Sequence, residues 1–199
     1  LEQGFRGLYF STGGFFHVDF SMGVNDSSLD PFWSLVEELD IPVHWYAGEY
    51  RNPMMEIYLR ELEDFDVWAK THQNITSVLT HGLNNISMLR GQPDSVRYQL
   101  PEVMVRLLKN QNWSIELMLH LMASDSPYPP YNSNLDNLVE DLINKIGIEK
   151  LIWGSDMPAC ERTLSYKQSL VLYKEKCEFL TQDQRDLITG GNLERLYPL

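Results

Sequence analysis

Short runs of β-type residues alternate along this chain with longer stretches in which apolar residues recur at helical spacing. The pattern predicts strands at residues 7–10, 41–46, 76–81, 113–120 and 150–156. It predicts helices at about 30–39, 53–72, 100–109, 135–146, 165–179 and 182–188. Gly147 and the Gly190–Gly191 pair are expected to end the helices that precede them. This alternating order predicts parallel strands joined by helical crossovers.

Two architectures share that order, a (β/α) barrel and a doubly wound open sheet. From residue 113 to residue 120 apolar and other side chains alternate: Trp113, Ser114, Ile115, Glu116, Leu117, Met118, Leu119, His120. A strand covered by helices on both faces is apolar throughout, whereas a barrel strand packs one face on helices and turns the other inward. The alternation therefore favours an α/β fold of the TIM-barrel type, with the open sheet as the alternative.

A complete barrel of this type has eight strands in about 250 residues. The chain has 199 residues and five predicted strands. We therefore expect residues 1–199 to form a single domain that is an incomplete (β/α)8 barrel, about strands 4–8 with their helices. The start at Leu1 fits a fragment, with roughly three β/α units before it. The open sheet edges that remain predict a homo-oligomer.

Charge and composition indicate which classes of partner the protein is expected to bind. Sixteen Lys and Arg against 28 Asp and Glu give a formal net charge of −12. A surface this acidic argues against nucleic acid and anionic membrane as partners, and no run of apolar residues has the length of a membrane span. The two cysteines are too few for a disulfide framework, which favours the cytoplasm. A small-molecule substrate is the expected partner.

Candidate chemistry lies at the ends of the predicted strands. Four strands end in a titratable or metal-capable residue: Tyr46, His81, His120 and Asp156. The carboxyl ends of parallel barrel strands meet at one rim, so these groups are expected to converge. Glu116 is predicted to face inward, either as a polar core residue with a partner or as a carboxyl group with altered protonation. Glu49 and His17 are weaker candidates.

Five segments together resemble the amidohydrolase-2 group of the amidohydrolase superfamily. The group includes aminocarboxymuconate-semialdehyde decarboxylase, resorcylate-type decarboxylases and pyrone-dicarboxylate lactonase. Gly4–Gly7 resembles the start of its fourth strand, and Leu39–Val43 the step into its fifth. The other matching segments are Asn74–Gly82 at the sixth strand, Ile148–Pro158 at the eighth and Gly191–Tyr197 in the closing helix. The resemblance covers nearly the whole chain.

The resemblance implies roles for particular residues. It makes Asp156 the strand-8 carboxylate that binds a divalent metal, zinc or manganese, and serves as acid or base. It makes His81 the strand-6 histidine that faces substrate or metal. The family's metal-binding histidine on strand 5 is replaced here by Tyr46, so His44, two residues earlier on the same face, is the substitute ligand. The family's His-x-His pair on strand 1 lies outside the 199 residues.

Three functions remain open from the sequence. The first is a metal-dependent hydrolase acting on a small carboxylated or cyclic, lactone-like substrate, in which Asp156 handles the proton and His81 orients the substrate. The second is a non-oxidative decarboxylase of an aromatic or muconate-like acid that uses the same residues. The third is a metal-free binding protein on the same barrel, motivated by Tyr46.

Overall fold

The computed structural model describes residues 4–12, 23–47, 55–83, 100–118, 133–162 and 164–197. Its strands are β1 (Leu8–Ser11), β2 (Val43–Tyr46), β3 (Ser77–Thr80), β4 (Trp113–Leu117) and β5 (Leu151–Trp153). Its α-helices are α2 (Asp30–Glu38), α3 (Met55–Thr71), α4 (Glu102–Leu108), α6 (Ser133–Ile146), α7 (Tyr166–Val171), α8 (Gln182–Asp186) and α9 (Asn192–Leu196). Shorter 3₁₀ and π segments are η1 (Ser27–Leu29), η3 (Ile148–Lys150), η4 (Ala159–Arg162), η5 (Leu172–Lys176) and η6 (Leu187–Gly191).

The strand order confirms the barrel interpretation. The described strands form one sheet in the order β1-β2-β3-β4-β5, and the registered pairs β1–β2, β2–β3 and β4–β5 are parallel. A doubly wound sheet reverses its strand order at a switch point, and this sheet does not. Each β/α unit therefore adds its strand on the same side of the previous one, as in an incomplete (β/α) barrel.

The chain divides into two compact units. The first contains Leu1–Thr80 and Leu100–Ser114, and the second contains His81–Gln99 and Ile115–Leu199. The prediction of a single domain over residues 1–199 stays a prediction. None of the described helices combines the length and apolar composition that a membrane span requires.

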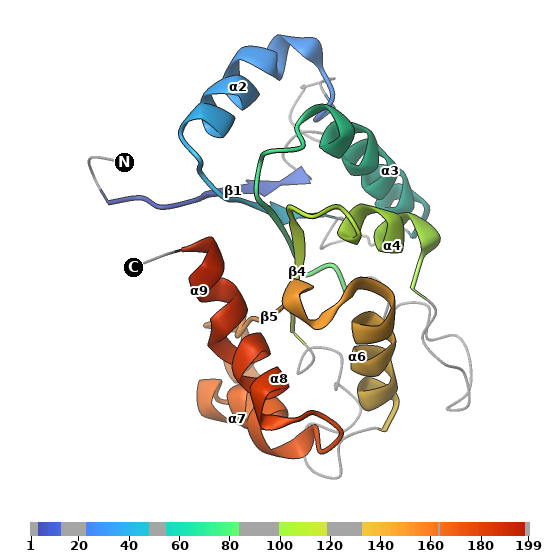
Figure 1. Cartoon of the computed structure of the whole chain (residues 1–199), viewed down its shortest axis with the longest axis vertical. Helices are drawn as coiled ribbons and strands as arrows, with labels where there is room; N and C mark the ends of the chain where they lie inside the picture. The colour runs from blue at the N-terminus through green and yellow to red at the C-terminus, as the bar shows by residue number, and fades with distance from the viewer. Residues whose placement is uncertain are drawn as a thin grey trace. The chain divides into compact units, whose positions relative to one another are not determined.

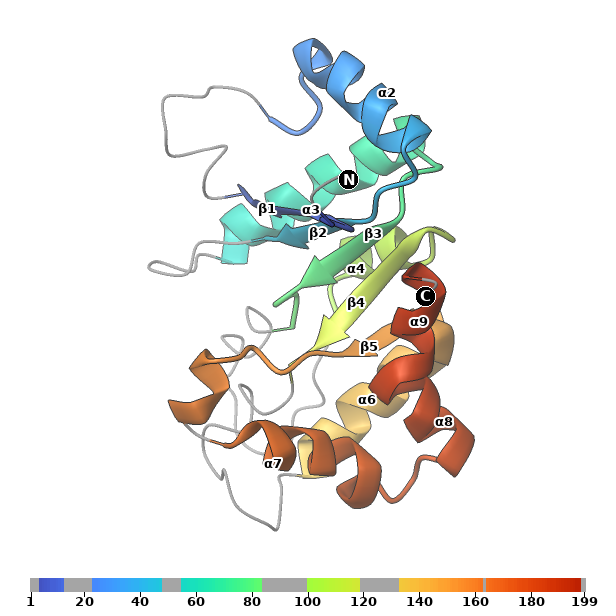
Figure 2. The same cartoon turned by 90° about the vertical axis from the view of Figure 1, so that its left-hand side faces the viewer.

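In the first unit, one face of the strands is packed by aromatic rings. Figure 2 shows β1, β2 and β3 running in the same direction, and α3 lies beside α4. Side chains of β2 alternate as in a barrel strand, since Val43 and Trp45 are buried whereas His44 and Tyr46 are half-buried. Trp45 meets rings from both helices that cover this face, Trp33 of α2 and Trp68 of α3, at centroid distances of 5.5 and 5.1 Å.

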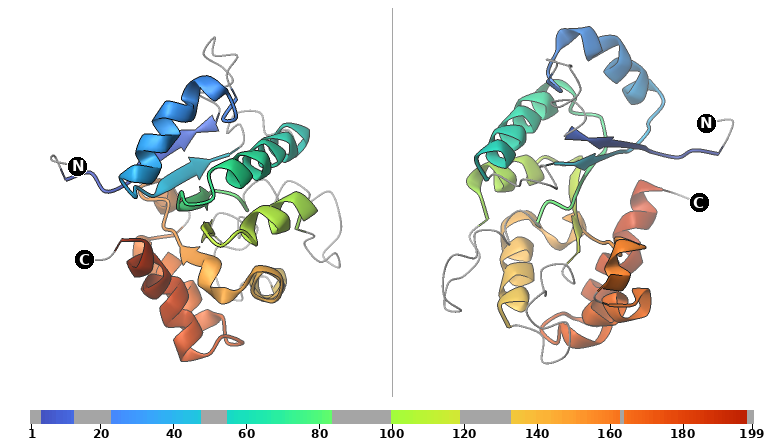
Figure 3. Two further views of the ribbon diagram at one scale, coloured as in Figure 1. Left: turned by 45° about the horizontal axis from the view of Figure 1, so that its top comes forward. Right: turned by 180° about the vertical axis from the view of Figure 1, so that it is seen from behind.

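The second unit is built from the end of β4, α6, β5 and the C-terminal helices. Figures 1 and 3 show α8 and α9 as successive parts of one helical run. Asn192, at the start of α9, is buried, and its Nδ2 donates hydrogen bonds to the backbone oxygens of Ile148 (2.8 Å) and Leu151 (2.7 Å). One side chain thus fixes the C-terminal helices to the entry of β5.

The predicted helix end at Gly190–Gly191 is wrong. The chain passes through both glycines in η6 and continues directly into α9. Gly191 has φ −57° and ψ −35°, an ordinary right-handed helical conformation. A glycine ends a helix when it adopts positive φ, and here the bonds made by Asn192 favour continued helix instead. Gly147, in contrast, has φ 95° and follows the last residue of α6, so that helix end is confirmed.

Candidate functional site

The structure brings His81 and Asp156 together in the second unit. His81 follows β3 directly, and Asp156 lies three residues after the last residue of β5. The His81 Nε2 atom is 3.2 Å from the Asp156 Oδ1 atom, and the two side chains are 20% and 22% exposed. Both are therefore shielded yet open to a small molecule. The two strand ends converge as the barrel topology predicts.

Both residues have a backbone conformation that is uncommon for side-chain-bearing residues. His81 has φ 56° and Asp156 has φ 52°, in the left-handed region. Such conformations cost of order 1–3 kcal/mol and persist where the surrounding structure requires them, often at functional sites. At these two residues a positive φ coincides with the contact between their side chains.

The protonation of the pair follows from its surroundings. Burial lowers the pKa of His81, and the negative charge and hydrogen bond of Asp156 offset this only in part. The imidazole is therefore neutral at neutral pH. A carboxylate has no proton to donate, so the neutral ring carries its hydrogen on Nε2 and donates it to Asp156. This leaves the lone pair of the ring on Nδ1.

Glu116 adds a second carboxyl group to this region of the second unit. It lies on β4, on the face opposite Ile115 and Leu117, as the alternation predicts. Burial, followed by the negative charge of Asp156, raises the pKa of Glu116 to about 7. Of the two alternatives left open by the sequence, altered protonation is the one that the surroundings of Glu116 favour.

Gly154 leaves the space that the Glu116 side chain occupies, and sequence reasoning did not link these two residues. An added Cβ at Gly154 would lie 1.9 Å from Glu116 Oε1 and 2.3 Å from its Cδ atom. Such distances are far inside van der Waals contact, so Gly154 is required for Glu116 to keep this position. The sequence does show a glycine two residues before Asp156. Why a glycine is needed there becomes clear only from Glu116 on the neighbouring strand.

The other predicted site residues lie in the first unit or outside the described residues. His44 lies on β2 in the first unit, half-buried, and burial lowers its pKa. Tyr46 lies on the same face of that strand. His17, Glu49 and His120 lie outside the described residues.

The described donors do not complete a metal site. A catalytic zinc site uses three protein ligands and keeps one position for water or substrate. Among residues 4–12, 23–47, 55–83, 100–118, 133–162 and 164–197, no three His, Cys, Asp or Glu side chains are arranged to hold a metal ion. Within these ranges, His81 and Asp156 are two potential metal ligands that lie in contact. The metal roles of Asp156, His81 and His44 stay predictions.

A buried polar cluster in the first unit was also missed. Glu61 of α3 is 3% exposed, and Thr12 Oγ1 lies 3.0 Å from its Oε2 atom and 3.1 Å from the backbone oxygen of Tyr46. Burial and the charge of Glu61 raise the pKa of Tyr58. The sequence signal was a glutamate among apolar residues on one helix face, since Tyr58, Leu62 and Phe65 are buried too. We interpret this cluster as a polar part of the core.

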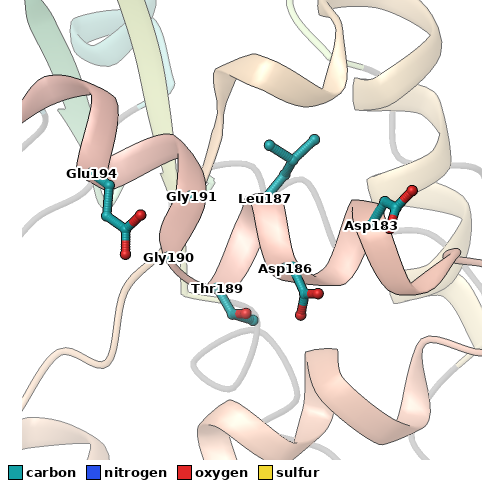
Figure 4. Close-up of a pocket in the computed structure, with 7 residues that line it drawn as sticks. All are labelled: Asp183, Asp186, Leu187, Thr189, Gly190, Gly191 and Glu194. Carbon is teal, nitrogen blue, oxygen red and sulfur yellow. The ribbon is translucent and has the colours of Figure 1, made fainter.

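A surface hollow lies elsewhere in the second unit. Figure 4 shows it along α8, η6 and α9, with the side chains of Asp186 and Thr189 on the same side of the helical run. Its lining is Asp183, Asp186, Leu187, Thr189, Gly190, Gly191 and Glu194. These residues include carboxylates but no histidine or cysteine, so the hollow lacks the acid–base pairing found at Asp156.

Comparisons with known proteins agree with the fold. A family model for amidohydrolases matches residues 1–199. An amidohydrolase from Burkholderia multivorans with bound HEPES is similar in structure, with a TM-score of 0.71 at 19% identity over 98% of this chain and 65% of that one. No curated protein gives a significant sequence match.

Two further solved structures have the same fold. A Burkholderia multivorans amidohydrolase with bound zinc has a TM-score of 0.59 at 17% identity, over 88% of this chain and 58% of that one. A probable 2-pyrone-4,6-dicarboxylic acid hydrolase from Acinetobacter baumannii, with citric acid bound, has a TM-score of 0.65 at 18% identity. The match covers 100% of this chain and 66% of that one. This chain thus spans about two thirds of the length of the first structure compared. Because the family model covers every residue, the chain belongs to the amidohydrolase family.

Proposed function

We propose that this protein is a hydrolase that opens a small cyclic or carboxylated ester, such as a lactone, at the His81–Asp156 pair. The observation that supports the proposal most is the 3.2 Å contact between His81 Nε2 and Asp156 Oδ1 at the ends of two barrel strands. Membership of the amidohydrolase family and the likeness to a probable 2-pyrone-4,6-dicarboxylic acid hydrolase support the choice of reaction.

The chemistry can be derived from the two side chains. The Asp156 carboxylate accepts a proton from a water molecule while the water oxygen bonds to the substrate carbonyl carbon. His81, neutral because burial lowers its pKa, donates its Nε2 hydrogen to Asp156 and so fixes the direction of the carboxylate. Each residue is partly exposed, so a small substrate can reach both.

A metal ion would add Lewis-acid chemistry, and we keep it as a separate proposal. Zinc or manganese bound through Asp156, His81 and His44 is the predicted arrangement, and one structurally similar amidohydrolase contains zinc. Among the described residues, no third His, Cys, Asp or Glu joins His81 and Asp156 to form a metal site. The proton transfer is therefore derived from the side chains of this chain.

The test is a substrate screen on the full chain. The probes are dihydrocoumarin, δ-valerolactone, 2-pyrone-4,6-dicarboxylic acid and 2,6-dihydroxybenzoic acid, each with chelator and with added zinc or manganese. Ring opening is followed by proton release, and decarboxylation by release of CO₂. We expect proton release without CO₂ from at least one lactone.

Asp156→Asn is the decisive variant, and Asp183→Asn, at an exposed carboxylate of α8, is its matched control. Loss of a general base costs about 10²–10⁴-fold in rate, so Asp156→Asn should lose at least 10²-fold while the control keeps its rate. CO₂ release would replace this proposal with the decarboxylase. Full activity of Asp156→Asn, or no turnover of any probe, would favour the binding protein.

A further inference from the structure

The side chain of Glu116 occupies the place where residue 154 would otherwise carry its own side chain. An added Cβ at Gly154 would lie 1.9 Å from Oε1, 2.3 Å from Cδ and 2.4 Å from Cγ of Glu116. The whole end of the glutamate therefore rests on the glycine backbone. Gly154 also donates its backbone N–H to the Leu117 oxygen at 3.0 Å, which holds the two chain segments in register at this point.

The register shows in which direction Glu116 reaches. Glu116 pairs with Ile152 in the parallel ladder, yet its carboxyl group rests on Gly154, two residues farther along the chain. The side chain thus leans along the strand direction toward the segment that carries Asp156. The charge of Asp156 acts on the Glu116 carboxyl group, so the two groups sense each other.

The surroundings of Glu116 change its protonation. Burial and the charge of Asp156 raise the pKa of Glu116 to about 7, so near neutral pH a large share of Glu116 carries a proton. A protonated carboxyl group is a hydrogen-bond donor and an acid. Asp156 accepts the hydrogen bond of His81 and serves as the acceptor of protons. A carboxyl group with a raised pKa, near another carboxyl group that accepts hydrogen bonds, is a usual arrangement for a separate acid and base.

We propose that Glu116 is a further catalytic residue, the general acid that protonates the oxygen leaving from the substrate, and that Gly154 is the residue that seats it. The proposal rests on the hydrolase function proposed above. It goes beyond that function because it assigns the second proton transfer to a residue that the family resemblance does not mark.

Hydrolysis of a lactone then needs two proton transfers, one at each carboxyl group. Asp156 takes a proton from water as the water oxygen bonds to the carbonyl carbon. The bond between that carbon and the ring oxygen then breaks, and Glu116 gives its proton to this oxygen, which becomes a hydroxyl group. Asp156 is left protonated and Glu116 ionised, and transfer of one proton from Asp156 to Glu116 restores both. The net reaction adds one water to the lactone and yields a hydroxy acid.

The experiment uses leaving groups of different basicity on the full chain. The ring oxygen of dihydrocoumarin leaves as a phenol, which needs little protonation, whereas the ring oxygen of δ-valerolactone leaves as an alcohol and needs a proton. A missing general acid costs about 10²–10⁴-fold where the proton is needed. We therefore expect Glu116→Gln to lose at least 10²-fold on δ-valerolactone and less than about tenfold on dihydrocoumarin. Glu194→Gln, at an exposed position of α9, is the matched control and should change neither rate.

The outcomes separate this proposal from the proposed function. An equal loss on both lactones, or no loss on either, would overturn the role of Glu116 as acid, while loss of both activities in Asp156→Asn would still support the hydrolase. Failure of the unmodified chain to hydrolyse any of the three lactone probes would contradict the hydrolase, and the role of Glu116 would fall with it. Hydrolysis of 2-pyrone-4,6-dicarboxylic acid that Glu116→Gln leaves unchanged would overturn the role of Glu116 alone. Near-ultraviolet circular dichroism of each variant checks that the fold is intact, and Glu116→Asp should restore part of the δ-valerolactone rate.

Discussion

The two compact units of the chain bury their side chains with opposite consequences. In the first, Trp33, Trp45, Trp68 and Trp113 are each at most 1% exposed and pack on one another and on Phe65. In the second, burial and the charge of Asp156 raise the pKa of Glu116, and burial keeps His81 in its neutral form. Burial of apolar rings stabilises the fold, whereas burial of ionisable groups costs stability and changes their chemistry.

This contrast separates the residues that stabilise the fold from those that could react. Removing a ring from the aromatic core should harm folding without changing any reacting group. Removing a carboxyl group from the polar site should alter chemistry and pH dependence while the fold persists.

Trp45→Ala should produce the largest loss of stability. Trp45 is fully buried, and its ring lies 5.0 Å from that of Phe65 and 5.1 Å from that of Trp68. Truncating a buried aromatic residue costs about 3–5 kcal/mol in the free energy of unfolding. Urea unfolding measures the loss, and Val67→Ala, at a 52% exposed position of α3, is the control. If Trp45→Ala and Val67→Ala had similar effects, the aromatic core would not be the stabilising region.

Glu116→Gln should remove a pH dependence of stability. The pKa of Glu116 is about 7 in the folded protein against an ordinary 4.5, so the folded state binds more protons between these values. The stabilisation from this extra proton is complete below about pH 4.5 and is lost as the pH rises toward 7, by about 3 kcal/mol in total. The difference in unfolding free energy between the unmodified chain and Glu116→Gln should therefore fall by that amount across the window. A pH-independent difference would contradict the assigned burial of the acid.

Asn192→Ala tests whether one polar side chain secures the second unit. Its buried amide donates to the backbone oxygens of Ile148 and Leu151, and losing these two hydrogen bonds should cost about 1–3 kcal/mol in the free energy of unfolding. Urea unfolding measures it, with Glu194→Ala on the same helix as the control. A change no larger than that of the control would show that the C-terminal helices are held by other contacts.

The smallest effect is expected at the ion pairs between α3 and α4. Arg106 Nε lies 2.9 Å from Asp66 Oδ2, and Arg106 Nη2 lies 2.6 Å from Glu63 Oε2. The pair of Arg106 with Glu63 is exposed, so it contributes little and is screened by salt. Asp66 is buried, but Lys70 Nζ lies 2.8 Å from the same Oδ2 atom and keeps a cation there when Arg106 is removed. Arg106→Met should lower the urea midpoint less than Asn192→Ala does, and high salt should shrink the difference. A large decrease that salt does not affect would instead indicate a packing role for the arginine.

Much of the fold could be predicted from the sequence because its signals are local. The alternation at Val43, His44, Trp45 and Tyr46 marks which side chains face the helices, and the structure confirms it. The predicted helix end at Gly190–Gly191 is wrong because the helix there is favoured by hydrogen bonds from Asn192 to Ile148 and Leu151, which are distant in the sequence. A local pattern does not contain that tertiary contact.

The candidate site could be predicted only in part. Barrel topology predicts that His81 and Asp156 meet, because strand ends converge whatever the sequence between them. The state of Glu116 depends on its burial, the charge of Asp156 and the space at Gly154, and all of these arise when strands become neighbours. Sequence alone therefore left Glu116 with two interpretations.

The most direct test of the polar site is the ¹³C NMR titration of the Glu116 carboxyl carbon in the full chain, repeated in Asp156→Asn. Glu116→Gln identifies the signal. We expect a pKa near 7 in the unmodified chain and a lower value in Asp156→Asn, because the neighbouring negative charge is removed while the burial stays. A pKa near the ordinary 4.5, or one that Asp156→Asn leaves unchanged, would contradict the coupling of the two carboxyl groups.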